Sequence, residues 1–249
     1  MIELKSLCFS YGKNRVLRGI SHCFKRGIFT ALMGPNGCGK TTTIKNIASI
    51  LSPQRGEILI EGKNLEKISL KEISRFMAYV RQKPDSLPNM TVIESVLSGR
   101  IPFMSYYETE SDRKSVYKVI KELGLEHIKD KSVEEISGGE LQKTLIAQAL
   151  AKDPEILLLD EPLNNLDIKN QSEIMRLTAQ KTVEKNMVTI CVLHDLNMAL
   201  RFCSEILILD KGEIVFAGKT EAFTSETAKK IFKVDCEIIK KDNKIYALY

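Results

Sequence analysis

Residues 34–41 read Gly34-Pro35-Asn36-Gly37-Cys38-Gly39-Lys40-Thr41. This run satisfies G-x-x-x-x-G-K-[ST], the loop whose backbone amides wrap the phosphates of a nucleotide. Its glycines let the backbone approach a ligand without a clashing Cβ, so that amides converge on anionic oxygens at a helix N-terminus. Lys40 adds a point positive charge, and the hydroxyl of Thr41 suits an octahedral Mg²⁺ that also takes phosphate oxygens. The run predicts a nucleotide phosphate site.

The residues on either side of this loop supply the context that the motif requires. Ile28 to Met33 is a short apolar run typical of a buried strand, and residues 41–50 have the apolar spacing of a helix. A glycine turn followed by a surface lysine is the alternative explanation. A loop between a strand and a helix favours the phosphate site instead.

Length and composition set the broad class. The chain has 249 residues, 43% of them hydrophobic, which is enough for one large domain or two small ones. A net charge of +5 suits phosphate ligands, nucleic acid or an anionic membrane surface, and does not choose among them. The six cysteines are dispersed, without C-x-x-C pairs, so neither a disulfide framework nor a zinc site is indicated. A reducing cytoplasm fits best.

Membrane-spanning and export signals are not evident in the sequence. No apolar stretch approaches the roughly 18 residues needed to cross a bilayer, and the N-terminus lacks the pattern of a signal peptide. We therefore expect that the chain neither crosses a membrane nor is exported. If it works at a membrane, it does so as a peripheral subunit.

Apolar periodicity predicts an α/β core. Antiparallel strands are expected at residues 2–9, 16–24 and 28–33, and further strands at residues 56–62, 77–80, 156–159, 188–193, 206–209 and 214–217. The later runs are nearly continuous in apolar residues, as in a parallel sheet covered on both faces. The segment from Lys83 to about Leu150, broken early by Pro84, Pro88 and Pro102, is predicted to be a mostly helical insertion. A hairpin turn at residues 210–213 and a small helix at residues 224–232 follow.

Two acids end one of these strands. Asp160 and Glu161 follow the apolar run Ile156 to Leu159, at the strand end where open α/β sheets bind ligands. Asp160 is suited to hold Mg²⁺, directly or through water. Glu161 is the natural general base for a water that attacks a γ-phosphate. A strand that merely ends in solvated acids is the alternative, and the upstream phosphate loop disfavours it.

A second small-residue turn precedes an amphipathic segment. Ser137-Gly138-Gly139-Glu140 is followed by apolar residues at 141, 145, 146, 149 and 150, and Asp153-Pro154 ends the helix. A helix start of this kind binds anions through unpaired amides and the helix dipole. Taken alone, an N-cap with a flexible turn explains the pattern as well.

Six motifs in order resemble those of the nucleotide-binding subunits of ABC transporters, over essentially the whole length. They are the Walker A loop (residues 34–42), the Q-loop at Gln82, the signature motif (residues 137–140), Walker B (residues 156–161), the D-loop (residues 164–167) and the switch histidine His194. The resemblance implies an α/β fold: a P-loop NTPase ABC-type domain over residues 1–249, with an antiparallel β subdomain. It implies a helical insertion over about residues 83–150 and a C-terminal extension over about residues 218–249.

The same resemblance implies the site. ATP binds residues of the Walker A loop, namely Gly34, Pro35, Asn36, Gly37, Cys38, Gly39, Lys40, Thr41 and Thr42. In a head-to-tail dimer, Ser137, Gly138 and Gly139 of one subunit close over the γ-phosphate held by the other, and Asp167 belongs to this nucleotide-binding set. Glu161 activates the attacking water and His194 contacts the γ-phosphate.

The resemblance also implies the magnesium ligands and the residue that stacks on the adenine ring. Gln82 senses magnesium, the water and the membrane partner, and the magnesium set is Thr41, Gln82 and Asp160. Tyr11 matches the aromatic residue that stacks on adenine, although a tyrosine after an alternating strand is more often packed against it.

The sequence departs from the family pattern in three places. The signature reads Ile-Ser-Gly-Gly-Glu where the family has Leu-Ser-Gly-Gly-Gln, residues 141–143 replace an arginine-rich stretch, and Asn164 stands where serine is usual. Ser137 and both glycines are kept, so we expect the ATP sandwich to be kept.

Two segments narrow the resemblance further. Residues 91–103 and 194–203 look like those of the ATPases of metal-chelate importers, which handle ferric siderophores, haem and cobalamin; molybdate or tungstate importers are an alternative. A single set of motifs implies a separate subunit at the cytoplasmic face of the membrane. It serves permease subunits and, indirectly, an extracytoplasmic substrate-binding protein. In the family, residues 83–100 dock the permease.

Two other classes of ABC ATPase stay open. One handles nucleic acid, but such proteins usually carry a long coiled-coil insertion or two nucleotide domains, so no nucleic acid partner is expected; strongly salt-dependent DNA or RNA binding would favour it. The other is a cytosolic ATPase of cofactor assembly. Isolation from intact cells without a membrane partner would favour that class.

Overall fold

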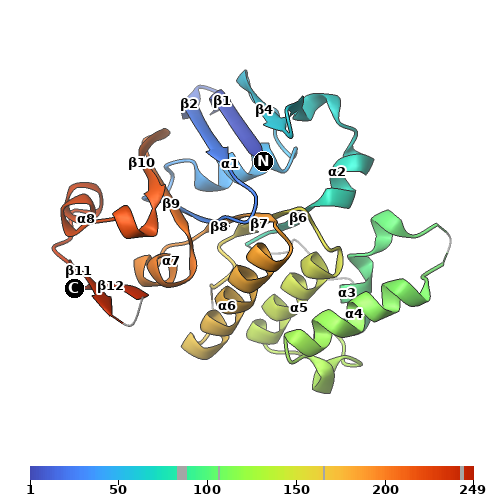
Figure 1. The fold of residues 1–249 in the computed structure, drawn as a ribbon. Helices are drawn as coiled ribbons and strands as arrows, with labels where there is room; N and C mark the ends of the chain where they lie inside the picture. The colour runs from blue at the N-terminus through green and yellow to red at the C-terminus, as the bar shows by residue number, and fades with distance from the viewer. Residues whose placement is uncertain (83–88, 106, 165, 242–243) are drawn as a thin grey trace. The chain divides into compact units, whose positions relative to one another are not determined.

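The computed structural model describes residues 1–82, 89–105, 107–164, 166–241 and 244–249. Figure 1 traces the chain from its N-terminal strands to its C-terminal hairpin. The chain divides into two compact units, one made of residues 1–68 and 179–249 and the other of residues 69–178. Among the described residues, no helix has the length and apolar character that crossing a membrane requires.

An antiparallel sheet in the first unit has the strand order β2-β1-β4-β5. Its strands are β1 (Ile2–Tyr11), β2 (Asn14–Phe24), β4 (Arg55–Ile60) and β5 (Lys63–Asn64). Ile2 lies opposite Phe24 on one side and Ile60 on the other, and all three side chains are buried. The alternation of apolar and polar residues along β1 thus gives the sheet one buried face.

A second sheet of the first unit carries the phosphate loop. Strand β3 (Phe29–Met33) lies between β8 (Val188–Val192) and β9 (Glu205–Asp210), parallel to both. Strand β10 (Glu213–Lys219) pairs antiparallel with β9 through the predicted hairpin turn. The expectation that residues 28–33 continue an antiparallel set was wrong. All five residues of β3 are buried, and such continuous burial is typical of an interior parallel strand.

Helices and a terminal hairpin complete the first unit. The helices are α1 (Lys40–Ile47), α7 (Leu196–Phe202) and α8 (Ser225–Phe232), with 3-10 turns at Leu65–Lys67 and Thr220–Ala222. The hairpin of β11 (Glu237–Lys241) and β12 (Lys244–Leu248) was not foreseen from the sequence. It is fixed to α7, because the amide of Asn197 donates to the Ala247 carbonyl at 3.0 Å and accepts from its N–H at 2.8 Å.

The second unit is mainly helical. Its helices are α2 (Leu70–Phe76), α3 (Val92–Ser98), α4 (Glu110–Glu122), α5 (Gly138–Ala151) and α6 (Ile168–Glu184), the last of which continues into the first unit; 3-10 turns lie at Ile101–Phe103 and Glu126–Ile128. The parallel strands β6 (Met77–Val80) and β7 (Ile156–Asp160) pair within it. Four of the helices begin with a capping box, at Ser69, Thr91, Thr109 and Ser137. Pro84 and Pro88 lie outside the described residues.

Helices α3 and α5 touch at a glycine. A Cβ built on Gly99 would lie 2.1 Å from the Gln148 carbonyl oxygen, so only glycine permits this approach. The Gln148 amide donates to Ser98 Oγ at 2.6 Å beside it. Next along the chain, Arg100 Nε donates to the buried Asp112 carboxylate at 2.8 Å. This ion pair joins α4 to the end of α3.

Candidate nucleotide-binding site

The phosphate loop lies between β3 and α1, as predicted. Gly34 has φ of 139°, and a Cβ on it would lie 2.0 Å from the Leu209 carbonyl oxygen, so no other residue fits. A Cβ on Gly37 would meet nothing within 4 Å, which leaves open space beside the loop. Helix α1 has neither a side-chain cap nor an acid in its first turn. Its N-terminal amides and dipole are therefore suited to an external anion.

The buried Lys40 side chain forms hydrogen bonds with the backbone of the loop. Its ammonium donates to the carbonyl oxygens of Gly34 at 2.8 Å and Pro35 at 2.9 Å, and the residue is only 5% exposed. A buried cation so close to the loop amides concentrates positive charge at one point. Cys38 is buried next to it, and burial raises the pKa of its thiol, so the side chain fills space as a neutral group.

His194 follows a strand next to β3. Leu32 pairs with Val192, and the Leu193 N–H donates to the Leu32 carbonyl at 3.2 Å. Because parallel strands end at the same edge, His194 and Gly34 leave the sheet side by side. His194 is exposed, and Asp195 caps α7 directly after it by accepting from the Asn197 N–H at 2.7 Å.

Tyr11 ends β1 and is 49% exposed. Its ring meets Phe9 edge to face, with 4.9 Å between the centroids. This contact is the packing that the sequence left as an alternative to adenine stacking, and the exposed part of the ring leaves stacking available.

Asp160 ends β7 in the second unit and is 2% exposed. The Tyr79 hydroxyl donates to its Oδ2 at 3.2 Å, and both burial and the charge of Asp160 raise the pKa of that hydroxyl. Sequence reasoning missed Tyr79. The signal available was a tyrosine in the strand that leads to Gln82, in β6, which pairs with β7.

Glu161 turns away from the strand. Its φ of 51° lies in the left-handed region, which a residue with a side chain enters only at some energetic cost. Its Oε2 accepts from the Gln82 amide at 2.6 Å and from the Asn164 amide at 2.8 Å. The structure thus brings Gln82 and Glu161 together. It also places Asn164 beside the Glu161 carboxylate, a position whose departure from the family pattern could not be interpreted from the sequence.

The Ser137 turn starts α5. Gly138 is exposed, and a Cβ on it would meet nothing within 4 Å. A Cβ on Gly139 would lie 3.3 Å from Leu166, so this turn and the D-loop are neighbours in one chain. Asp167 accepts from the Asn170 N–H at 2.7 Å and caps α6. Asn165 of the D-loop lies outside the described residues.

The oxygen donors fit the predicted metal. Thr41 offers a hydroxyl, Asp160 a carboxylate and Gln82 an amide oxygen. Mg²⁺ prefers hard oxygen ligands and is commonly held by one or two carboxylates together with substrate phosphates. Each of these oxygen donors is thus of a kind that magnesium binds, Thr41 in the first unit and Asp160 and Gln82 in the second, and the loop glycines suit a triphosphate.

Comparison with known proteins identifies the family. The model of the ABC transporter family matches residues 17–164, more than half of the chain. The chain belongs to the ABC transporter family. An uncharacterised ABC transporter ATP-binding protein of Methanocaldococcus jannaschii is 40% identical over 96% of this chain and 93% of its own length. The iron(3+)-hydroxamate import ATP-binding protein FhuC of Bacillus subtilis is 34% identical over 96% of this chain and 90% of its own.

A solved structure of the ABC transporter family agrees in fold. The dimeric structure of the bacterial ABC transporter cassette MJ0796 has a TM-score of 0.80 and 30% identity, and covers 90% of this chain and 100% of that one. The predicted family and fold class are confirmed. This ABC protein is an ATP-binding and ATP-hydrolysing subunit, and its kind works as a dimer together with membrane permeases.

Proposed function

We propose that two copies of this ABC ATPase bind two ATP molecules head to tail, and that closure and hydrolysis drive an importer. The observation that carries this proposal is the Glu161 carboxylate, held at the end of the Walker B strand by two amide donors on one oxygen. A carboxylate fixed at this position is a general base for an attacking water. Binding closes the dimer, and hydrolysis resets the open state while the permease switches its access.

Each remaining residue of the proposed site has a role that its chemistry supports. Lys40 and the α1 amides bind the phosphates, and Ser137, Gly138, Gly139 and Asp167 close from the partner copy. Glu161 takes the proton of the water, His194 contacts the γ-phosphate and Tyr11 stacks on the base. Thr41, Asp160 and Gln82 would hold Mg²⁺, which neutralises phosphate charge when bound. Residues 1–249 act as one domain, with residues 83–150 as an insertion and 218–249 as an extension.

Gly138 offers a test that separates folding from function. Gly138→Ala should fold normally, because its Cβ meets nothing in the described chain and alanine favours a helix. ATP-driven dimerisation should weaken roughly tenfold, since one extra methyl in a tight contact costs about 1–3 kcal/mol. Thermal melting and sedimentation with ATP measure the two effects. Dimerisation at the wild-type ATP concentration would place the γ-phosphate away from this turn.

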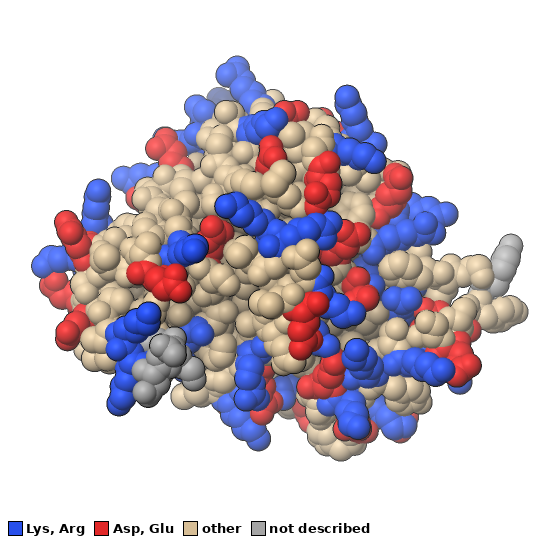
Figure 2. Space-filling model, viewed as in Figure 1, with Lys and Arg blue, Asp and Glu red and all other residues tan. Residues whose placement is uncertain are grey.

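The cargo we propose is an iron-siderophore, haem or cobalamin. FhuC acts in iron(3+)-hydroxamate import, and residues 91–103 and 194–203 resemble those of metal-chelate importers. An extracytoplasmic binding protein delivers the cargo, and the ATPase sits at the cytoplasmic face of the membrane. Molybdate or tungstate import is the alternative within transport. The nucleic-acid class is less well supported, since acidic side chains lie among the basic ones over the face in Figure 2.

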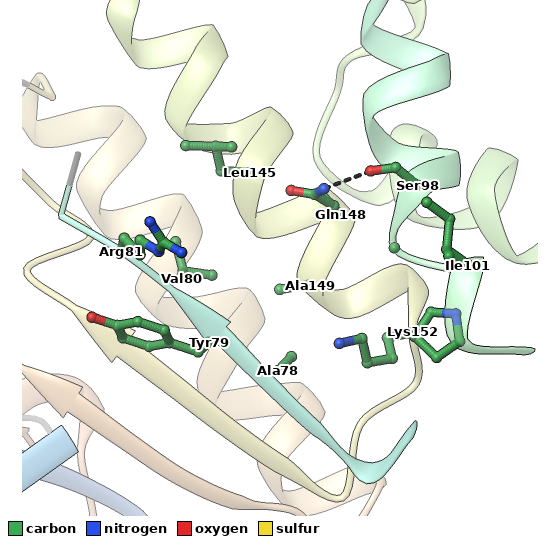
Figure 3. Close-up of a pocket in the computed structure, with 12 residues that line it drawn as sticks. Ala78, Tyr79, Val80, Arg81, Ser98, Ile101, Leu145, Gln148, Ala149 and Lys152 are labelled. Carbon is green, nitrogen blue, oxygen red and sulfur yellow. Dashed lines mark hydrogen bonds between the residues drawn. The ribbon is translucent and has the colours of Figure 1, made fainter. Parts of the chain in front are cut away.

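The second unit contains a candidate docking site for the permease. A pocket of about 590 Å³ lies between β6 and the helices α3 and α5, and Figure 3 shows Arg81 and Lys152 at its wall. Lys152 donates to the Met77 carbonyl at 3.1 Å, and burial lowers the pKa of its ammonium. Exposed Ile101 also lines the pocket. We propose that a permease segment docks here, beside residues 89–100; residues 83–88 of the predicted docking segment lie outside the described residues.

Purification from native membranes tests the transport proposal. A tagged chain extracted in mild detergent should carry a multi-span permease with it. In proteoliposomes, a binding protein loaded with ferric hydroxamate should raise ATP hydrolysis severalfold, and the same binding protein without iron should not. Recovery of the chain without any membrane partner would favour cofactor assembly instead. Retention on nucleic acid that is lost at high salt would favour the nucleic-acid class.

A further inference from the structure

At the start of α5, the hydrogen-bond donors of Ser137 are already bound to an acidic side chain of the same helix. The Ser137 N–H donates to Glu140 Oε2 at 2.9 Å, and the Ser137 hydroxyl donates to the same oxygen at 2.7 Å. In return, the Glu140 N–H donates to Ser137 Oγ at 3.3 Å. These bonds form a capping box whose acceptor is a carboxylate, at the position where the family pattern has glutamine.

This carboxylate is ionised. Hydrogen bonds from Ser137 hold the pKa of Glu140 below its usual range, and the His127 ring faces the other carboxylate oxygen with 3.6 Å between Nε2 and Oε1. A negative charge therefore lies at the helix start that a triphosphate has to reach. The amides and the dipole of α5 already attract the Glu140 carboxylate, so they attract an external anion less strongly.

We propose that the charged Glu140 side chain keeps the hydrogen-bond donors of the Ser137 turn occupied within their own chain, so that the turn is self-occupied. Glu140 thereby sets the ATP concentration at which two copies close. The inference rests on the proposed head-to-tail dimer. A serine hydroxyl has one hydrogen, so Ser137 cannot donate to Glu140 and to a γ-phosphate oxygen together. Closure must break the bond from Ser137 to Glu140 and bring the phosphate close to a like charge. ATP binding to the Walker A loop of a single copy is unaffected.

One substitution isolates the charge. In Glu140→Gln, the amide oxygen can accept both hydrogen bonds from Ser137, so the helix cap is kept while the charge is lost. Glu173→Gln is the matched control. Glu173 bonds Lys143 of α5 at 2.9 Å, so this change also removes one negative charge beside the same helix, but away from the Ser137 turn.

The experiment measures closure directly. Both changes are made in a Glu161→Gln parent, which holds ATP without turnover, and sedimentation gives the ATP concentration at half-maximal dimer. Removing one like charge near the phosphate should lower this concentration by about three- to tenfold in Glu140→Gln, with a smaller effect in high salt. Glu173→Gln should match the parent. In the variant with Glu161 intact, the KM for ATP should fall while kcat changes little.

The outcomes separate two failures. If the parent dimerises with ATP and Glu140→Gln requires the same concentration, the proposal that the charged Glu140 sets the closing concentration is refuted and the ATP sandwich stands. An equal decrease in Glu173→Gln would also refute it, because a general charge effect would explain the result. If the parent stays monomeric at saturating ATP, the proposed function fails and this inference fails with it.

Discussion

Glu161→Gln is expected to bind ATP normally and to hydrolyse it about 10² to 10⁴ times more slowly, the loss typical of removing a general base. The carboxylate accepts hydrogen bonds from Gln82 and Asn164 on one oxygen, which fixes its direction. Glutamine has nearly the same shape and its amide oxygen can accept both of these hydrogen bonds, but an amide does not take a proton from water. Because the triphosphate persists, the variant should accumulate the ATP-bound dimer.

Steady-state phosphate release, ATP affinity and sedimentation together check this prediction. Glu134→Gln, an exposed glutamate in the segment before the Ser137 turn, is a matched control with the same loss of charge and should hydrolyse ATP normally. Wild-type turnover in Glu161→Gln would remove Glu161 from its role. The left-handed backbone at Glu161 would then need another explanation.

Local chemistry made much of the site predictable from the sequence. The phosphate loop needs glycine where a Cβ would strike the Leu209 carbonyl, and the spacing of its residues reflects that demand. The strands were also predictable, because buried parallel strands are nearly continuous in apolar residues, as Ile156 to Leu159 shows.

Pairing and long-range contacts were harder to predict. An apolar run does not state which strand it joins, which is why β3 was expected in an antiparallel set and lies between β8 and β9 instead. The bond from Tyr79 to Asp160 joins residues 81 positions apart, and no local pattern encodes it. The capping box of Ser69 and Glu72, in contrast, is a local signal for α2 that the sequence analysis did not use.

Lys40→Ala is expected to weaken ATP binding roughly 10- to 150-fold, since a hydrogen bond to a charged group contributes about 1.5–3 kcal/mol. The ammonium lies within 2.9 Å of the Gly34 and Pro35 carbonyl oxygens, so it is already positioned inside the loop. Its removal takes away the point charge that the phosphates require, and it also leaves two loop carbonyls without their donor. Isothermal titration with ATP measures the affinity.

Two further variants separate charge from loop structure. Lys40→Met keeps most of the apolar stem and loses the charge, so it should bind ATP about as weakly as Lys40→Ala while melting closer to wild type. Lys45→Ala removes a lysine from the last turn of the same helix and should leave the affinity unchanged. Wild-type affinity in Lys40→Met would mean that the loop amides and the dipole of α1 hold the phosphates without the lysine. Binding by this loop would then depend on backbone geometry alone.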